Sequence, residues 1–348
     1  MSSLTSTLFY KSAFPGCIAH VSSLNSPGPL DVCFSVRAHL ALSPPNTSAA
    51  RSLIDAHSAP LGESTTKALR IFTDVIEAVA ASTPGAGGEE QEEDRDLGNQ
   101  VVALSEVHEA IIEGVEYFDG EEEQVECLLA TTQYLDQDPI GALETLKVNS
   151  AAAGGDPQKN LGSIALAVHI LLLIHRPDVA QKLYDSARTW AEDSLVIQLV
   201  EASLGVYKGG RPAQQAYYVY DEFSSLAASS EEGKGGRLAS MRMGRGVALM
   251  RRGEWKKAEE SVREAGTSLQ QGGDAEEGKN GLAKEVKANL AVLAGYLNPQ
   301  SKLGNPGQEY LNGLASPAPP HQLSTSLSEM DKRFDELVAS RAVAAASS

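Results

Sequence analysis

Apolar and polar residues follow a helical period between Arg242 and Ala265, in the stretch RMGRGVALMRRGEWKKAEESVREA. Ala258, Val262 and Ala265 recur at spacings of four and three residues, which is typical of the buried face of a helix. Gly253 lies before this stripe, at the expected position of a turn. The pattern predicts two short antiparallel helices. Because one such hairpin cannot bury its own apolar face, neighbours of the same kind are expected.

Residue size within this hairpin agrees with close helix packing. Gly246 on the first helix, beside Leu249, and Ala258 on the second are small where two helices approach each other. Trp255 opens the second helix and is large enough to fill a gap between hairpins. These features supply a register with which other hairpins can be found.

The same surroundings recur along the chain: a turn, then a small residue, then apolar residues about four and seven positions later. The small residues are Cys17, Ala50, Ala103, Ala142, Ala180, Ala216 and Ala258. Successive steps are 33, 53, 39, 38, 36 and 42 residues, and each long step contains a Gly-rich or acidic insertion. A period near 34 residues in helical hairpins is the tetratricopeptide pattern. We predict an all-α, tetratricopeptide-type hairpin solenoid, a right-handed superhelix that curls into a ring.

Two breaks define the predicted domains. Residues 83–97 are rich in Gly, Glu and Asp, and we expect a disordered acidic loop inside a solenoid of residues 1–314. After the proline-rich stretch 317–320, apolar residues of 327–338 predict a last helix. Residues 315–348 are therefore expected to form a C-terminal capping helix with a frayed tail.

Charge, cysteine content and the length of apolar runs exclude several classes of protein. The formal net charge is −17, which disfavours a dedicated nucleic-acid binder. The three cysteines, Cys17, Cys33 and Cys127, fit no metal or redox spacing, and we expect small core residues in a reducing compartment. The longest apolar run, 164–174, is too short to span a bilayer, so a soluble, cytosolic protein is expected.

Catalytic motifs are weak throughout, and we predict that the chain is not an enzyme and has no catalytic, cofactor or metal site. His108-Glu109 lacks the second histidine of HExxH, and His169 is expected to be a hydrogen-bonded core residue. Ser64 through Lys67 fits SxxK, but a helix start explains Ser64 better. The acidic run 121–123 is expected to be a solvated face.

Residues 237–257 form a positive island, with seven basic residues and one acid, Glu254. Two interpretations stay open here. The island is either a solvated face balanced by nearby acids or a contact for an acidic partner or an anionic membrane.

Several segments together resemble the coatomer epsilon subunit family. They are RPDVAQK at 176–182, QAYYVYDEF at 215–223, GEWKKAE at 253–259, NLAVL at 289–293 and FDELV at 334–338. The resemblance follows the chain in order and is specific from about 138 to 297. The acidic insertion and the linker 229–236 are longer than the family's turns, which puts only local contacts in doubt.

This resemblance implies a ring of tetratricopeptide-like repeats that clasps the C-terminal domain of the coatomer alpha subunit. It implies a non-enzymatic subunit of the COPI coat without cofactors, acting in Golgi-to-ER retrograde and intra-Golgi transport. It also implies a cytoplasmic location, peripheral on Golgi membranes and COPI vesicles. The partner site is expected on first-helix residues chosen by position alone: Tyr134, Gln198, Glu201, Arg242, Arg245 and Asn289. The alternative is a tetratricopeptide adaptor or co-chaperone that binds peptide tails.

Overall fold

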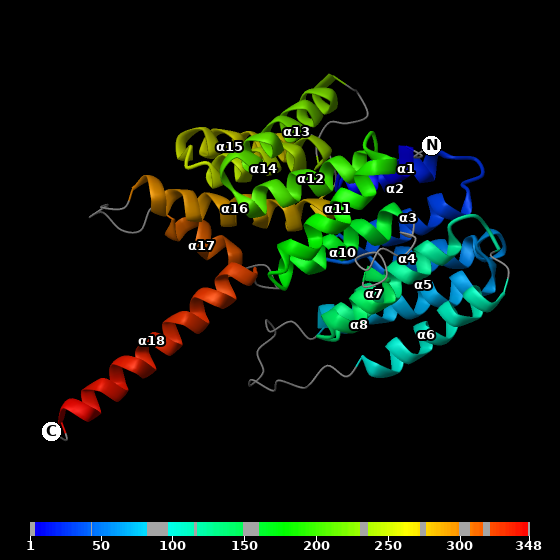
Figure 1. The fold of residues 1–348 in the computed structure, drawn as a ribbon, viewed down its shortest axis with the longest axis horizontal. Helices are drawn as coiled ribbons and strands as arrows, with labels where there is room; N and C mark the ends of the chain where they lie inside the picture. Colours follow the sequence, from blue (N-terminus) through cyan, green and yellow to red (C-terminus); the bar gives the residue numbers. More distant parts are fainter. Residues whose placement is uncertain are drawn as a thin grey trace.

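A computed structural model of the protein describes residues 4–42, 44–81, 97–114, 117–148, 160–229, 236–271, 276–298, 307–315 and 321–346. Within these ranges every regular element is a helix (Figure 1). This confirms the predicted all-α class.

The N-terminal half of the described chain contains helices, each packed on the next along the sequence. Their bounds are α1 Leu4–Tyr10, α2 Phe14–Ser23, α3 Pro29–Leu40, α4 Thr47–Ala56, α5 Ser58–Ala81, α6 Gly98–Glu113, α7 Glu121–Leu135 and α8 Pro139–Thr145. The start of α8 follows its sequence signals. Asp138 accepts a hydrogen bond from the amide of Gly141 at 2.8 Å, and Pro139 occupies the first helical position.

The C-terminal half continues the pattern and ends in a longer helix. The bounds are α10 Leu161–Leu173, α11 Pro177–Ala191, α12 Leu195–Lys208, α13 Gly210–Ser229, α14 Gly236–Arg251, α15 Trp255–Gln271, α16 Glu276–Leu297, α17 Gln308–Ala315 and α18 Gln322–Ala346.

The helices pack as a solenoid of hairpins. Within each hairpin the two helices are neighbours, as in α3 with α4, α12 with α13 and α14 with α15. The first helices also pack on one another in an unbroken row, α1, α3, α5, α7, α10, α12, α14 and α16. Each second helix contacts the next first helix along the chain. This arrangement is the hairpin solenoid predicted from the repeat.

The hairpin of α14 and α15 has the predicted internal packing. Gly253 forms the turn with φ of 77°, a backbone conformation that glycine adopts without strain. A methyl group on Gly246 would lie 2.7 Å from Cγ2 of Val262, so only glycine permits this helix approach. Trp255 stacks on Tyr296 of α16, with ring centroids 4.2 Å apart. The indole therefore fills the gap to the next hairpin, as expected.

One position of the predicted register is wrong. In α6 the residue buried at the small-residue position is Leu104, and Ala103 is only partly buried. Leu104, His108 and Ile111 then reproduce the four- and three-residue spacing of the other second helices, and all three are buried. The register of a second helix is counted from the turn before it. The long insertion before α6 removes that reference point in the sequence, which explains the error of one residue.

The core is divided into local clusters, as expected for a chain of repeats. One cluster joins α3 to α7, a second joins α7 to α12, and a third joins α14 to α16. All three cysteines are free and buried, which confirms their expected place in the core. His169, in contrast, is exposed on α10, so the expectation of a core histidine is wrong.

The two distant parts of the solenoid meet. Helix α2 packs on α14, and the ammonium of Lys11 lies 4.5 Å from the ring centroid of Phe223 on α13. Lys11 is only 4% exposed, so this contact belongs to the interior. The superhelix is thus closed by its first hairpin.

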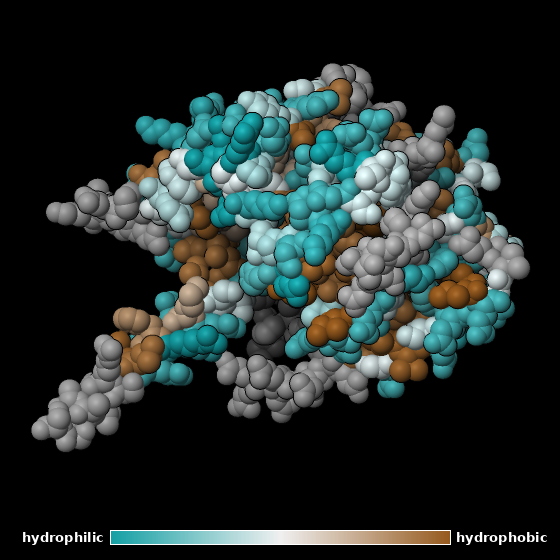
Figure 2. Space-filling view, viewed as in Figure 1, coloured by the Kyte–Doolittle hydropathy of each residue, from teal (hydrophilic) through white to brown (hydrophobic). Residues whose placement is uncertain are grey.

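The C-terminal segment forms α18, which contacts α17 and extends away from the body (Figure 1). Met330, Phe334, Leu337 and Val338 bring apolar side chains to its surface (Figure 2). The capping role of residues 315–348 stays a prediction. The predicted acidic loop lies outside the described residues except for Leu97, which is buried at the start of α6.

Candidate functional site

The six predicted partner-binding residues all lie on first helices of hairpins. Tyr134 is on α7, Gln198 and Glu201 are on α12, Arg242 and Arg245 are on α14, and Asn289 is on α16. The structure brings the last three together, because α14 packs on both α15 and α16. Of the first three, Tyr134 on α7 is separated from Gln198 and Glu201 on α12 by helix α10 of the row.

Arg245 is committed to contacts within the chain. Its guanidinium donates to Asp221 at 2.9 Å, to Glu264 at 2.6 Å and to the hydroxyl of Ser261 at 2.9 Å. Burial lowers the pKa of Arg245, but the bond to Asp221 and the charge of Glu264 outweigh this and raise it. Arg245 therefore joins α13, α14 and α15.

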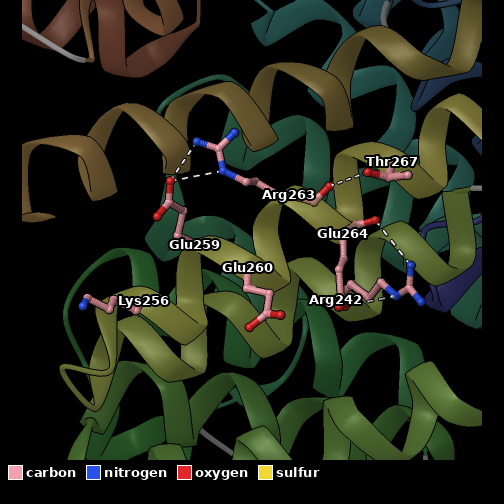
Figure 3. Close-up of a pocket in the computed structure, with 7 residues that line it drawn as sticks. All are labelled: Arg242, Lys256, Glu259, Glu260, Arg263, Glu264 and Thr267. Atoms are coloured by element: carbon pink, nitrogen blue, oxygen red, sulfur yellow. Dashed lines mark hydrogen bonds and ion pairs between the residues drawn. The ribbon is translucent and has the colours of Figure 1, made fainter.

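Arg242 lies at one edge of a hollow of about 520 Å³ on α14 and α15 (Figure 3). It donates to the hydroxyl of Ser268 at 2.7 Å and lies 3.8 Å from the carboxylate of Glu264. Arg263 pairs with Glu259 at 2.7 Å on the same surface. The bases and acids that line the hollow balance: Arg242, Lys256 and Arg263 against Glu259, Glu260 and Glu264.

This balance of charge determines which ligands the hollow favours. It favours neither an anionic nor a cationic ligand, and Thr267 is the single hydroxyl among the lining residues. No general base is held against that hydroxyl there, since Thr267 donates to the backbone carbonyl of Arg263 at 3.1 Å. The arrangement presents a charge-balanced polar surface formed by α14 and α15.

The remaining candidates are partly buried. Asn289 donates to the carbonyl of Glu285 at 2.8 Å and lies 3.6 Å from the sulfur of Met243. Burial, and then a hydrogen bond to Glu201, raise the pKa of Tyr184 on α11 to about 12. Tyr134 packs on the second core cluster.

Five of the seven cations in the positive island of 237–257 contact acids or carbonyl oxygens of the same chain. Arg251 donates to the carbonyls of Val206 and Tyr207 at the end of α12, at 2.8 and 2.7 Å. Arg252 and Lys257 pair with Glu254 at 2.6 and 2.8 Å. Together with the pairing of Arg242 and Arg245, this supports the first interpretation, a face balanced by nearby acids.

The start of α7, residues 121–126, is a polar cluster that the sequence did not predict. Glu121 is 2% exposed and accepts from the hydroxyl of Thr65 on α5 at 2.6 Å, so the expected solvated face is wrong. Gln124 accepts from Arg37 on α3 at 2.9 Å, and Glu123 accepts from the amide of Gly162 on α10 at 2.8 Å. Helix α7 packs on α5, α6, α8 and α10. Residues that are distant in the sequence supply the hydrogen bonds that make burial of these polar side chains possible.

Residues 89–342 match the family model of the coatomer epsilon subunit, which is more than half of the 348-residue chain. The chain belongs to the coatomer epsilon subunit family.

Relatives in plants and yeast are similar over parts of this coatomer epsilon family member. Coatomer subunit epsilon-1 of Arabidopsis thaliana is 27% identical over 51% of this chain and 52% of its own length. Coatomer subunit epsilon-2 of Oryza sativa subsp. indica is 28% identical over 49% of this chain and 50% of its own length. A probable coatomer subunit epsilon of Schizosaccharomyces pombe is 30% identical over 24% of this chain and 31% of its own length. The chain spans about half the length of the plant relatives it matches.

A structural comparison found a tetratricopeptide repeat protein from Parabacteroides merdae. It shares 9% identity and a TM-score of 0.42, over 82% of this chain and 97% of that one. Among the described residues, none of the helices has the length and apolarity needed to cross a membrane.

Proposed function

We propose that this chain is a non-catalytic structural subunit of the COPI coatomer. It binds the C-terminal domain of the coatomer alpha subunit, and through it joins the coat that carries Golgi-to-ER retrograde and intra-Golgi traffic. Its place is the cytoplasm, peripheral on Golgi membranes and on COPI vesicles. The observation that supports this most strongly is the coatomer epsilon match over residues 89–342.

The fold supports a binding role. First helices packed in one row present a continuous surface along the superhelix, and solenoids of this kind bind extended protein elements on such surfaces. Closure of the superhelix by α2 and α14 keeps that surface curved. We assign the contact to the first-helix residues Tyr134, Gln198, Glu201, Arg242, Arg245 and Asn289.

An adaptor for acidic peptide tails is less well supported. Such an adaptor needs cationic side chains on first helices that are available for a peptide carboxylate. The two arginines in the candidate set, Arg242 and Arg245, already pair with Glu264, and Arg245 also pairs with Asp221.

Affinity purification of the tagged chain from cells tests the proposal. We expect the coatomer alpha subunit to be recovered together with the rest of the coat. Gln198→Arg, on first helix α12, is expected to reduce the recovery. Thr189→Arg is the control, because it adds the same side chain at an exposed site on second helix α11. It is expected to leave the recovery of the alpha subunit unchanged. Recovery of chaperones without coatomer would refute the proposal.

A further inference from the structure

One histidine occupies a position that is otherwise apolar or aromatic in the repeat. Four residues after the small-residue position, the other hairpins have Val21, Ile54, Leu146, Tyr184, Tyr220 and Val262, of which Leu146 directly follows α8. In α6 this position is His108. The side chain is only 7% exposed, and its Nε2 atom has no hydrogen-bond partner. A buried imidazole nitrogen without a partner is costly, so this atom calls for a specific explanation.

Two carboxylates of α7 face the same point. Glu122 and Glu126 are four residues apart and therefore lie on one face of the helix. The Nε2 or Nδ1 atom of His108 and one oxygen from each glutamate all lie within 4.8 Å of one another. Glu126 is fully buried at 0% exposure. The side chains converge, yet Nε2 of His108 makes no hydrogen bond to either carboxylate.

We propose that His108, Glu122 and Glu126 bind a divalent transition-metal ion, with Zn²⁺ as the best match, between α6 and α7. Imidazole and carboxylate together suit zinc, whereas magnesium and calcium prefer oxygen ligands alone. In a tetrahedral zinc site, bonds of about 2.1 Å place the ligand atoms roughly 3.4 Å apart. Small side-chain movements bring the three groups to that spacing, and a water molecule completes the coordination.

Burial makes the site selective for a cation. A nearby positive charge stabilises a buried carboxylate, and Glu126 is fully buried. A divalent ion supplies that charge and uses the imidazole nitrogen at the same time. It also links the second helix of one hairpin to the first helix of the next, across a repeat junction.

One cation of the chain competes for this site. The ammonium of Lys147 lies 3.0 Å from Glu122, and its side chain is 42% exposed. Because it reaches in from the surface after α8, it can move back into solvent when the metal binds. Removing its charge is therefore expected to strengthen metal binding rather than weaken it.

Titration of the full-length, chelator-treated chain with Zn²⁺ by calorimetry tests the proposal, with Co²⁺ absorption as the spectroscopic readout. We expect one saturable ion per chain and visible Co²⁺ bands. His108→Leu installs the side chain of the equivalent Leu146, so it is expected to fold. It should lower the Zn²⁺ affinity by roughly tenfold or more, because loss of a ligand costs at least as much as loss of an outer partner.

Two further variants separate this site from surface binding. Lys147→Gln is expected to raise the affinity for Zn²⁺. His321→Leu removes a histidine that pairs with Glu285 at 3.0 Å near the surface and should leave the affinity unchanged. The inference is refuted if the wild-type chain shows no saturable binding, if His108→Leu binds equally well, or if Ca²⁺ binds as tightly as Zn²⁺.

Discussion

The hydroxyl of Ser240 donates a hydrogen bond of 2.6 Å to the carbonyl oxygen of Lys11, 229 residues earlier in the chain. Ser240 lies on α14, in the seventh hairpin, and Lys11 follows α1, in the first. The bond therefore fastens the two parts of the superhelix that meet at its closure. Lys11 adds its ammonium over the ring of Phe223 at 4.5 Å.

Weakening this closure should loosen the first hairpin before the rest. Ser240→Ala removes the hydrogen bond and is expected to cost about 0.5–1.5 kcal/mol. Lys11→Met keeps the buried stem but removes the charge over Phe223, at a cost of about 0.5–2 kcal/mol. In hydrogen exchange, amides of α1 and α2 should exchange faster in both variants, while those of α10 stay protected.

Ser203→Ala is the matched control for the closure. Its hydroxyl donates to the carbonyl of Leu199 within the same helix at 2.9 Å and bonds Tyr220 of the same hairpin, so it joins no parts that are distant in the solenoid. We expect its exchange pattern to equal that of the wild type. Equal exchange of α1 and α2 in Ser240→Ala and the wild type would show that the closure does not depend on this bond.

Glycine at 246 is required by packing, whereas glycine at 295 is not. In Gly246→Ala the new methyl group meets Cγ2 of Val262 at 2.7 Å, and we expect a loss of about 1–3 kcal/mol. In Gly295→Ala the methyl group meets no atom within 4 Å, and better helix propensity should add about 0.5–1 kcal/mol. Chemical denaturation of both variants measures the difference. A stability gain in Gly246→Ala would contradict the close approach of α14 and α15.

The same helix pair predicts the effect of a larger side chain at Ala258. This residue is fully buried, and Ala258→Leu should overpack the third core cluster at a cost of about 1–3 kcal/mol. The melting temperature is the readout. An unchanged value would show that the pair can open to admit three extra carbon atoms.

The cysteines should not react in the native chain. Burial raises the pKa of Cys17 and Cys33 to about 12 and that of Cys127 to about 11. The thiolate, which is the reactive form, is therefore scarce at pH 8. A thiol reagent such as DTNB should label none of the three in buffer and all three in guanidinium. Rapid labelling of the folded chain would contradict their burial.

Removal of residues 329–348 tests the role of α18. The side chains of 329–338 are exposed, so we expect the melting temperature to stay within about 2 °C of the wild type. Removal of 308–348 takes away α17 as well, including the fully buried Leu314, and should lower it clearly. A large drop with the shorter deletion would instead establish the capping role predicted for this segment.

Local patterns predicted the solenoid because each hairpin carries its own signals. Gly253, Trp255 and Ala258 lie within six residues, and their spacing alone indicates the turn, the gap filler and the close contact. The register failed at Ala103 because the insertion before α6 removes the turn signal. Residue spacing alone therefore predicts a hairpin where a short turn without an insertion joins its two helices.

Buried polar groups could not be predicted in the same way. Gln124 is paired with Arg37, 87 residues away, and nothing near either residue in the sequence indicates this bond. An acidic run such as 121–123 has the composition of a solvated face until its distant partners are known. His108 showed no motif, and its significance depends on the register of the other hairpins.

Binding of the purified chain to the isolated C-terminal domain of the coatomer alpha subunit tests the proposed function most directly. Size-exclusion chromatography with light scattering should show a stable complex of one chain with one domain, and Gln198→Arg should weaken it. A correctly folded chain that elutes separately from the alpha domain would contradict the account.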